Sequence, residues 1–527
     1  MKGNPVKGMV SAPQPLAVDA GVKVLADGGN AVDAAVTAAF VQMVTTPRSC
    51  GVGGFGMMYI HTPESDTILD FHGKAGERVR PDMWEHEMLR ENATGYGYTL
   101  RDQVNERGYG AVTTPGTVAG LYRAQSDFGT IPWRATLQPG IAVATGGFEV
   151  THATAAAWKQ IPTPETTPWI TVAASPHEGG GELIANPHMA RTFSALAEGG
   201  EEVFYRGDLA KAIADDMEKG GGFITLEDLN RYEVTVTSPL VSRYREYTVA
   251  SNQPPGGGLT ILQMLKILEG YNLSDMEHLS TEYVYTVSMA MKAAWTDRAN
   301  LVGDPAFVEV PVEDLLCERR AAAWRRRIDA REKITIPRWR PQEPPSTTHI
   351  SVVDQWRNVV GLTHSLGSGS DVITPGLGFM YNNCMNCFNP VPGHVNSIEP
   401  GKSRTTGMAP TLVKRGDAPV FSVGAPGGTR IVTGILHAIL NVIDHGMSAT
   451  EAIAAPRFDC QSDVIVAHSR IAPSVCEGVR AMGHEVHSLL DGYGGIASVH
   501  GIILDPETGT LDGGADPGSP GMAMAVI

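Results

Sequence analysis

The pattern of apolar positions predicts two helices near the start of the chain. Residues 15–25 carry an apolar stripe, and the run from Gly28 to Asn30 then ends one helix and begins the next. Residues 31–44 are rich in alanine and apolar on most faces, which predicts a buried helix. The chain therefore begins with elements that belong to a large core.

Further along, short β-branched segments come in pairs that are joined by turns. Such pairs predict β-hairpins, because alternate side chains face opposite sides of a strand. The predicted hairpins cover residues 57–71, 347–366 and 411–423. Helices are expected near residues 190–200, 207–218, 259–270, 280–298 and 429–444. Hairpins near the start and in the last third, with helices between them, indicate stacked sheets covered by helices.

The clearest break in this pattern lies just before residue 347. Residues 318–333 form a basic, helix-like segment, which we interpret as a solvated helix face. It is followed by Pro337, Pro341, Pro344 and Pro345. Proline lacks a backbone N–H and restricts the residue before it, so this stretch is predicted to be extended and exposed.

Composition and charge narrow the class of protein. Hydrophobic residues make up 42% and charged residues 19% of the chain, which is typical of a globular protein with a large core. The formal net charge of -16 would repel phosphate backbones, so nucleic-acid binding is not expected. No stretch approaches the roughly 20 apolar residues that span a bilayer, and the first residues have no signal-peptide core. We expect a soluble cytoplasmic protein with a small-molecule partner and no membrane partner.

Two short motifs are interpreted as structural. Gly51, Gly53 and Gly56 match G-x-G-x-x-G, but the predicted order is helix, loop and strand, whereas a dinucleotide site needs strand, loop and helix. Cys384 and Cys387 form a C-x-x-C pair without the second ligand pair of a zinc site. We interpret the cysteines as small, soft residues that line a pocket. No cofactor and no metal are expected.

Thr347 stands at the start of a predicted strand, directly after the proline-rich stretch. A threonine hydroxyl is a poor nucleophile unless a base lies beside it. If the backbone were cut before Thr347, its free α-amino group, with a pKa of about 7.7–8.0, could accept the hydroxyl proton. By itself, Thr-Thr-His is also an ordinary beginning of a β-strand.

A glycine-rich turn, residues 424–430, lies between a predicted strand and a predicted helix. Successive backbone N–H groups at a helix N-terminus can stabilise developing negative charge. By itself, the same segment is equally an ordinary strand-to-helix turn.

Taken together and in this order, these segments resemble the γ-glutamyltransferase (γ-glutamyltranspeptidase) family. The resemblance covers nearly the whole chain. Its segments in this sequence are GMVSAPQPLAVDAGVKVLADGGNAVDAAVTAAF, VGGFGMMYIH with LDF, VTTPGTVAGLYRAQSDFGTIPW, TTHISVVDQWRNVV, YNNCMNCF, KSRTTGMAPTLV, GAPGGTRI and EAIAAPRF.

The resemblance implies an α+β fold, the αββα four-layer sandwich of N-terminal-nucleophile (Ntn) hydrolases. It implies a precursor that cleaves itself between Ser346 and Thr347. The products would be a large segment, residues 1–346, and a small segment, residues 347–527, which together form one αββα domain. These segments would form a heterodimer, with a heterotetramer as a further possibility.

The resemblance also assigns roles to individual residues. Thr347 would be the nucleophile of both self-cleavage and catalysis, and Gly427 and Gly428 would form the oxyanion hole. Ser365 stands where the family has a threonine hydroxyl that hydrogen-bonds the amine of the nucleophile. Asn383 lies in a paired-asparagine segment that we interpret as structural support.

The residues expected to bind substrate depart from the family pattern. His72 replaces an arginine that binds an α-carboxylate, Cys387 replaces an aspartate that pairs with an α-ammonium, and Cys384 replaces a glutamine. Gly367 replaces an asparagine, and Thr406 with Gly407 replaces a pair of serines. A desolvated ammonium without a carboxylate partner is costly, so the pocket is not expected to favour a free α-amino group.

Arg404 is an addition in the loop of Thr406, and two interpretations of it stay open. Its guanidinium could bind a carboxylate, or it could be an exposed loop arginine. The sequence thus predicts an autoprocessing amide hydrolase that acts on a non-glutamyl acyl group, as in a small carboxylate-bearing amide or in an acylated β-lactam or amine. The alternatives are a genuine γ-glutamyl transferase or glutathione hydrolase, and an uncleaved scaffold that binds a ligand without turnover.

Overall fold

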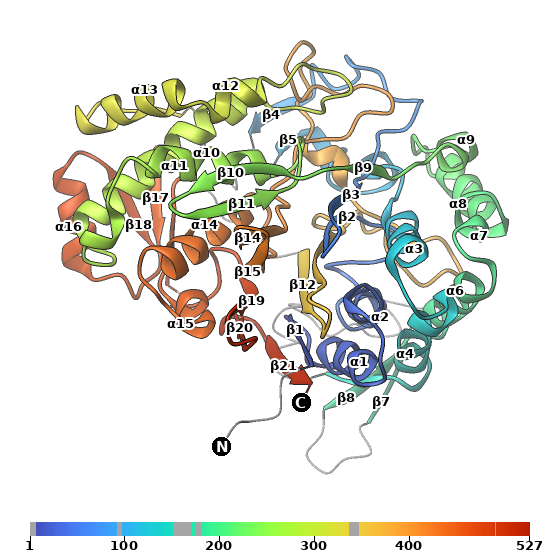
Figure 1. Ribbon diagram of the computed structural model, residues 1–527. Helices are drawn as coiled ribbons and strands as arrows, with labels where there is room; N and C mark the ends of the chain where they lie inside the picture. The colour runs from blue at the N-terminus through green and yellow to red at the C-terminus, as the bar shows by residue number, and fades with distance from the viewer. Residues whose placement is uncertain are drawn as a thin grey trace.

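The computed structural model describes residues 7–91, 97–150, 170–174, 181–336, 347–490 and 492–526. Helices and strands are mixed along this part of the chain, as expected for an α+β protein. Figure 1 shows the strands at the centre of the molecule and helices at its outside. Ser346 and the predicted proline-rich segment lie outside the described residues.

One sheet carries the predicted nucleophile. Its seven strands run in the order β21-β1-β12-β13-β2-β3-β9, and each pairs with its neighbour in antiparallel fashion. The strands are β1 (Gly8–Ala12), β2 (Phe55–Thr62), β3 (Ser65–Phe71), β9 (Thr235–Thr237), β12 (Thr347–Val353), β13 (Val359–Ser365) and β21 (Met522–Val526). This sheet contains strands from both sides of residue 347, which pair directly as β1–β21, β1–β12 and β2–β13. A cut at that point would therefore leave both pieces bound to each other by backbone ladders.

A second antiparallel sheet has six strands in the order β10-β11-β14-β15-β19-β20. They are β10 (Leu240–Tyr244), β11 (Tyr247–Ser251), β14 (Thr411–Arg415), β15 (Ala418–Gly424), β19 (His500–Leu504) and β20 (Leu511–Ala515). A cluster of apolar side chains that includes Tyr59, Val353, Leu412 and Ile502 joins the two sheets face to face. Because alternate side chains of a strand point to opposite faces, each sheet turns one set of side chains toward the other sheet.

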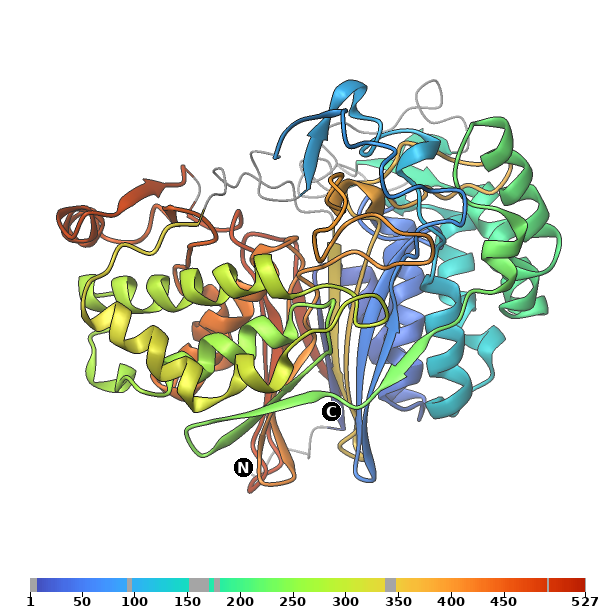
Figure 2. The same ribbon diagram turned by 90° about the horizontal axis from the view of Figure 1, so that it is seen from above.

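Helices cover the outer face of each sheet, as Figure 2 shows from above. Buried residues of α1 (Pro15–Ala26), α2 (Ala31–Thr45), α3 (Thr117–Phe128), α4 (Trp133–Gly146) and α6 (Pro187–Gly199) pack with the outer face of the first sheet. Those of α10 (Gly258–Leu268), α11 (Thr281–Leu301), α13 (Glu318–Asp329), α14 (Arg430–Ile443) and α16 (Pro473–Ala481) pack with the second.

Smaller elements complete the described residues. The strands are β4 (Met88–Glu91), β5 (Tyr98–Leu100), β6 (Phe148–Glu149), β7 (Thr171–Ala174), β8 (Glu182–Ala185), β16 (Phe458–Asp459), β17 (Val464–Ala467) and β18 (Glu485–Ser488). The helices are α7 (Glu202–Tyr205), α8 (Asp208–Lys219), α9 (Leu226–Asn230), α12 (Val312–Leu316) and α15 (Ala449–Ala454), with 3-10 turns η1 (Arg101–Gln103), η2 (Tyr109–Ala111), η3 (Leu273–Asp275) and η4 (Cys384–Cys387). None of the helices in the described ranges is both long and apolar enough to cross a membrane.

The predicted elements agree with this structure. Helix α2 is buried along its whole length, and a capping box between Asn30 and Asp33 fixes its start. The three predicted hairpins are β2–β3, β12–β13 and β14–β15. Gly51 and Gly53 lie in the loop between α2 and β2, and Gly56 is the second residue of β2. A β-carbon at Gly53 would lie 2.5 Å from the Met380 carbonyl oxygen. The interpretation of this segment as a close-packed turn is confirmed.

Candidate active site

Thr347 and Ser365 face each other at one end of the first sheet. The two residues are direct partners in the β12–β13 ladder, and their hydroxyl oxygens lie 3.0 Å apart. The backbone N–H of Gly367 donates to the Ser365 hydroxyl at 2.8 Å. One lone pair of Ser365 is therefore occupied, and the pair of hydroxyls is held in a fixed orientation. The structure brings the predicted nucleophile and its predicted partner into hydrogen-bond distance.

The same end of the sheet carries two aromatic residues in line with this pair. Ser365 is the ladder partner of Phe55, and Gly56 pairs with Phe71, so His72 follows opposite Phe55. Directly opposed residues point to the same face of a sheet. Thr347, Ser365, Phe55 and His72 therefore all face the second sheet. The rings of Phe55 and His72 are in contact, with their centres 4.6 Å apart.

Asn383 supports the loop that follows Ser365. Its side-chain oxygen accepts a hydrogen bond from the N–H of Ser368, and its amide donates to the Ser368 hydroxyl and to the carbonyl of Glu106. Gly367 has φ +74°, in the left-handed region that favours glycine. The interpretation of Asn383 as structural support is confirmed, and Gly367 contributes an N–H rather than a side chain.

The glycine-rich turn follows β15 at the same end of the molecule. His349, two residues after Thr347 on the same face, packs against Gly424, the last residue of β15. The next residues, Gly427 (φ +142°) and Gly428 (φ +58°), precede helix α14 and adopt conformations that favour glycine. The predicted N–H groups thus lie just before helix α14, a few residues after the end of β15 that His349 contacts.

The loop of Thr406 and Gly407 closes against this turn. A β-carbon at Gly407 would lie 2.1 Å from the carbonyl oxygen of Gly428, so only glycine permits the approach. The N–H of Thr406 donates to the Pro255 carbonyl, and the guanidinium of Arg298 donates to the Thr406 carbonyl at 2.7 Å. The departure from a serine pair therefore has a structural reason at position 407.

Arg404 is buried, with 1% of its surface exposed, so its interpretation as an exposed loop arginine is wrong. Its guanidinium carbon lies 5.0 Å from the centre of the Phe55 ring, and it donates to the Thr405 carbonyl at 2.8 Å. The Cys384 thiol is hydrogen-bonded with Arg404 and with Thr113, while burial raises its pKa. The fold thus places a permanent positive charge beside Phe55.

His72 cannot replace the arginine that the resemblance expects in its place. It is buried, and burial together with the nearby charge of Arg404 holds its pKa well below the ordinary value of 6.5. Its Nδ1 lies 3.2 Å from the Gly73 carbonyl, which can only accept, so Nδ1 carries the proton. The neutral ring therefore offers a lone pair at Nε2 and would not attract a carboxylate.

The C-x-x-C pair forms the 3-10 turn η4. Both thiols are buried and reduced, and the Cys387 sulfur lies 2.9 Å from the side-chain oxygen of Asn386. Within the described part of the chain, three or more His, Cys, Asp or Glu side chains nowhere gather as a set of metal ligands. Cys384 reaches the Arg404–Phe55 cluster, where a small side chain makes room for the guanidinium.

Phe55 is the site residue that sequence reasoning did not predict. Its position could have been found from the strand register, since it pairs with Ser365 in the extended β2–β13 ladder. Only the structure shows that Phe55 separates Ser365 from His72 and supports Arg404.

Known proteins match this chain over almost its whole length. The gamma-glutamyltranspeptidase family model matches residues 17–526. The chain belongs to the gamma-glutamyltranspeptidase family. It is 35% identical to the acylase ACY 1 proenzyme of Pseudomonas sp. (strain V22), over 99% of this chain and 94% of that protein. It is 32% identical to the glutathione hydrolase proenzyme of Bacillus subtilis (strain 168), over 98% of this chain and 91% of that protein.

A solved structure shows the same arrangement. The cephalosporin acylase from Bacillus halodurans superposes with a TM-score of 0.86 and 29% identity, covering 99% of this chain and 96% of that one. The matching relatives are thus enzymes that cleave or transfer acyl groups, and both curated relatives are named as proenzymes. This family member is accordingly an enzyme of the hydrolase and transferase type.

Proposed function

We propose that the chain is an autoprocessing Ntn amidohydrolase that cleaves itself between Ser346 and Thr347. The observation that carries this proposal is the 3.0 Å contact between the hydroxyls of Thr347 and Ser365 at the first residue of β12. Helices on the outer faces of two stacked sheets support the αββα sandwich that we propose. Residues 1–346 and 347–527 would then form one domain of two tightly paired chains.

The chemistry follows from the position of Thr347. Cleavage frees its α-amino group, which takes the proton of the hydroxyl as the oxygen attacks the amide carbon of the substrate. The carbonyl oxygen gains negative charge, and we propose that the N–H groups of Gly427 and Gly428 stabilise it. The amine product leaves with the proton, and the acyl group stays as an ester on Thr347. Water then attacks this ester and releases the acid.

The substrate we propose carries a small acyl group with a carboxylate. Arg404 supplies a buried guanidinium, whereas His72 is neutral and offers only a lone pair. By the resemblance, Cys387 stands where the family has the aspartate that pairs with an ammonium, so an ammonium here would lack that carboxylate. Acylases among the relatives support an acyl group other than γ-glutamyl, on an amine or β-lactam nucleus.

The cleavage is tested by denaturing gel electrophoresis and N-terminal sequencing of the purified protein. We expect two fragments, the smaller beginning with Thr347, and a single chain for Thr347→Ala. A Thr347→Ser variant should still cleave, since serine keeps a hydroxyl nucleophile. Two fragments from Thr347→Ala at the same junction, or an active protein that is uncut, would contradict the proposal. A stable and inactive single chain would favour the scaffold.

The acyl group is tested with two anilides that differ only in the α-amino group, γ-glutamyl anilide and glutaryl anilide. We expect a higher kcat/KM for glutaryl anilide, because the pocket binds a carboxylate without a partner for an ammonium. A clear preference for γ-glutamyl anilide would instead identify a genuine γ-glutamyl hydrolase or transferase. Hydroxylamine as a competing acceptor distinguishes transfer from hydrolysis.

A further inference from the structure

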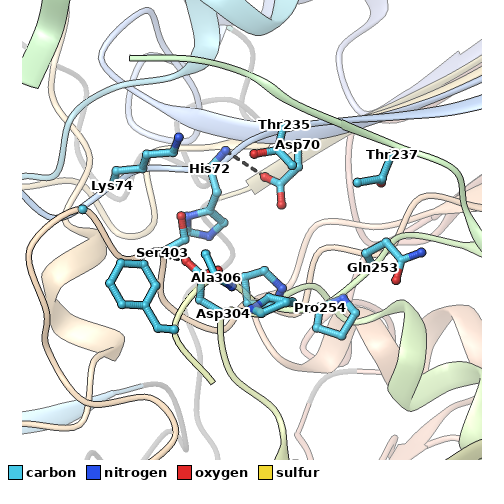
Figure 3. Close-up of a pocket in the computed structure, with 14 residues that line it drawn as sticks. Asp70, His72, Lys74, Thr235, Thr237, Gln253, Pro254, Asp304, Ala306 and Ser403 are labelled. Atoms are coloured by element: carbon cyan, nitrogen blue, oxygen red, sulfur yellow. Dashed lines mark hydrogen bonds between the residues drawn. The ribbon is translucent and has the colours of Figure 1, made fainter. Parts of the chain in front are cut away.

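The glycine-rich turn is bounded by a different part of the molecule from the cavity beside His72. That cavity, of about 330 Å³, lies at the edge of the first sheet, with Asp70 and His72 in its lining (Figure 3). None of the described residues that line it belongs to residues 424–430. The turn is instead in contact with the loop of residues 492–499, which leads from β18 to β19.

Ala497 of this loop lies directly against Gly427. A β-carbon at Gly427 would lie 2.7 Å from the Cα and 2.9 Å from the β-carbon of Ala497. One residue further, the N–H of Ser498 donates to the carbonyl of Pro426 at 2.9 Å. The methyl group of Ala497 also lies against Gly434 of α14, where a β-carbon would be 2.8 Å away. The turn and the start of α14 are therefore packed around one methyl group.

Ala497 holds an unfavourable backbone conformation. Its φ is +51°, in the left-handed region where a β-carbon is crowded by the following carbonyl oxygen. Gly494 and Gly495, earlier in the same loop, have φ +71° and +73°, which glycine adopts without this strain. A glycine at position 497 would relieve the strain, yet the chain carries alanine. Strain at a residue that touches the candidate site indicates a role for its side chain.

Two buried arginines hold the loop in this conformation. The guanidinium of Arg457 donates to the carbonyls of Ile496 and Ala497, at 3.0 and 3.1 Å. The guanidinium of Arg430 donates to the carbonyl of Gly495. Hydrogen bonds from a charged donor are stronger than those between neutral groups. The carbonyls on both sides of Ile496 are therefore fixed, and the backbone at position 497 has little freedom to turn.

Each arginine is itself paired with a buried aspartate. Arg457 pairs with Asp516, and Nε of Arg430 lies 3.6 Å from a carboxylate oxygen of Asp459. Each of these four side chains has no more than 3% of its surface exposed. Asp516 also accepts the N–H of Val499 at 3.3 Å. Because a buried charge is costly without its partner, the pairs keep their geometry, and the loop keeps one position.

We propose that Ala497 is a positioning residue for the oxyanion hole, a role that rests on the proposed function of the glycine-rich turn. Its methyl group fills the space behind Gly427, so the N–H groups of Gly427 and Gly428 stay directed at the substrate carbonyl. Donors of an oxyanion hole are effective because they are in place before charge develops. Ala497 acts through the turn and not on the substrate.

The proposal is tested with Ala497→Gly, which removes the methyl group and relieves the backbone strain. On the better of the two anilide substrates, kcat should fall about tenfold or more, because the donors then reorganise during the reaction. KM should change less than twofold, since the uncharged carbonyl gains little from these donors. The midpoint of urea unfolding should stay close to that of the wild type, because relief of strain offsets the lost packing and the freedom of glycine in the unfolded chain.

Ala290→Gly is the matched control. It deletes the same methyl group at a fully buried position in the interior of α11. It should lower the urea midpoint, because glycine is unfavourable inside a helix, but keep kcat within twofold of the wild type. An unchanged kcat in Ala497→Gly, or losses of kcat that follow the loss of stability in both variants, would overturn the proposal.

Hydrogen exchange measures the turn without any turnover. The amides of residues 424–430 should exchange about tenfold faster in Ala497→Gly than in the wild type, whereas residues 347–366 should exchange at the same rate in both proteins. Exchange that is unchanged in the turn would overturn the positioning role alone. Wild-type turnover by Thr347→Ala would instead overturn the proposed hydrolase function, so the two failures are distinguishable.

Discussion

The imidazole of His349 fills the space beside Gly424 that any larger residue would need. A β-carbon at position 424 would lie 2.1 Å from a ring carbon of His349. The ring is held by the hydroxyls of Thr363 and Ser351, at 2.8 and 3.0 Å. This contact joins the strand of the nucleophile to the strand that leads into the glycine-rich turn. The two halves of the candidate site therefore keep a fixed separation.

Replacement of Gly424 by alanine tests this contact. We expect Gly424→Ala to lower the free energy of unfolding by about 1–3 kcal/mol, because overpacking shifts the backbone or the ring. Urea unfolding of the two proteins measures the difference. Gly146→Ala is the matched control, since a β-carbon there meets nothing within 4 Å. A loss of similar size in both variants would show that the contact with His349 is not the cause.

Gly427→Ala should impair catalysis more than binding. The new side chain would lie 2.7 Å from the Cα of Ala497 at a φ of +142°, so the N–H groups of the turn would move. Loss of one oxyanion-hole donor lowers kcat by about 100- to 1,000-fold, and KM should change little. Gly446→Ala imposes a positive φ with nothing within 4 Å and should keep the wild-type kcat. An unchanged kcat in Gly427→Ala would remove this turn from the mechanism.

Ser365 should act through the hydroxyl that it places beside Thr347. We expect Ser365→Ala to slow both self-cleavage and turnover by about tenfold or more, since the partner of Thr347 is lost. Ser365→Thr keeps the hydroxyl and should restore most of the activity. The pH profile of kcat/KM should also shift in Ser365→Ala, because the environment of the Thr347 amine changes. A structural role alone would leave that profile in place.

Arg404 should decide the preference for a charged acyl group. Arg404→Met keeps an aliphatic chain over Phe55 but removes the charge. It should lower kcat/KM for glutaryl anilide about 10- to 100-fold, because a charge-assisted hydrogen bond contributes about 1.5–3 kcal/mol. Activity on an uncharged butyryl anilide should change far less. Arg415→Met is the matched control, because Arg415 stacks on Tyr247 at the surface. Equal losses on both anilides would mean that Arg404 serves the fold.

Asp70 should make the protein less stable as the pH rises. Its pKa is raised to about 7 by burial and by repulsion from Asp304, against the N–H of His72 and the charge of Lys74. Between pH 4 and pH 7 the folded state therefore holds a proton that the unfolded state, with a pKa near 3.8, has lost. The free energy of unfolding falls as the pH rises through this range. Asp70→Asn should remove this fall. The drop in the free energy of unfolding from pH 5 to pH 8 should therefore be smaller in Asp70→Asn than in the wild type, by at least about 1 kcal/mol.

Urea unfolding at pH 5 and pH 8 measures that difference. Asp82→Asn, at an exposed carboxylate, should follow the wild type at both pH values. A pH dependence that is the same in Asp70→Asn and the wild type would show that this carboxyl titrates normally.

Much of the fold could be predicted from local pattern. Period-2 alternation gave the hairpin of residues 347–366, and the apolar stripe with Gly28 and Asn30 gave helices α1 and α2. These elements follow from short-range rules of burial, capping and turns. The ordered motifs identified the family, and the family model agrees over residues 17–526. The cytoplasmic location and the oligomeric state stay predictions.

The local environment of each side chain could not be predicted in the same way. Arg404 could be exposed or buried by sequence alone, because burial depends on Phe55 and Cys384, which come from distant parts of the chain. The sequence likewise marked His72 as an unusual residue without showing its protonation. Its tautomer is fixed by the Gly73 carbonyl and its neutrality by burial.

By itself, the sequence determined the elements, the family and the identity of Thr347 as the candidate nucleophile, since these rest on periodicity and on ordered motifs. Only the tertiary structure decided that Ser365 touches Thr347, that Arg404 lies on Phe55, and that a cavity opens behind His72. Contacts between residues far apart in the chain depend on strand register and on packing between the sheets, and no local pattern encodes either one.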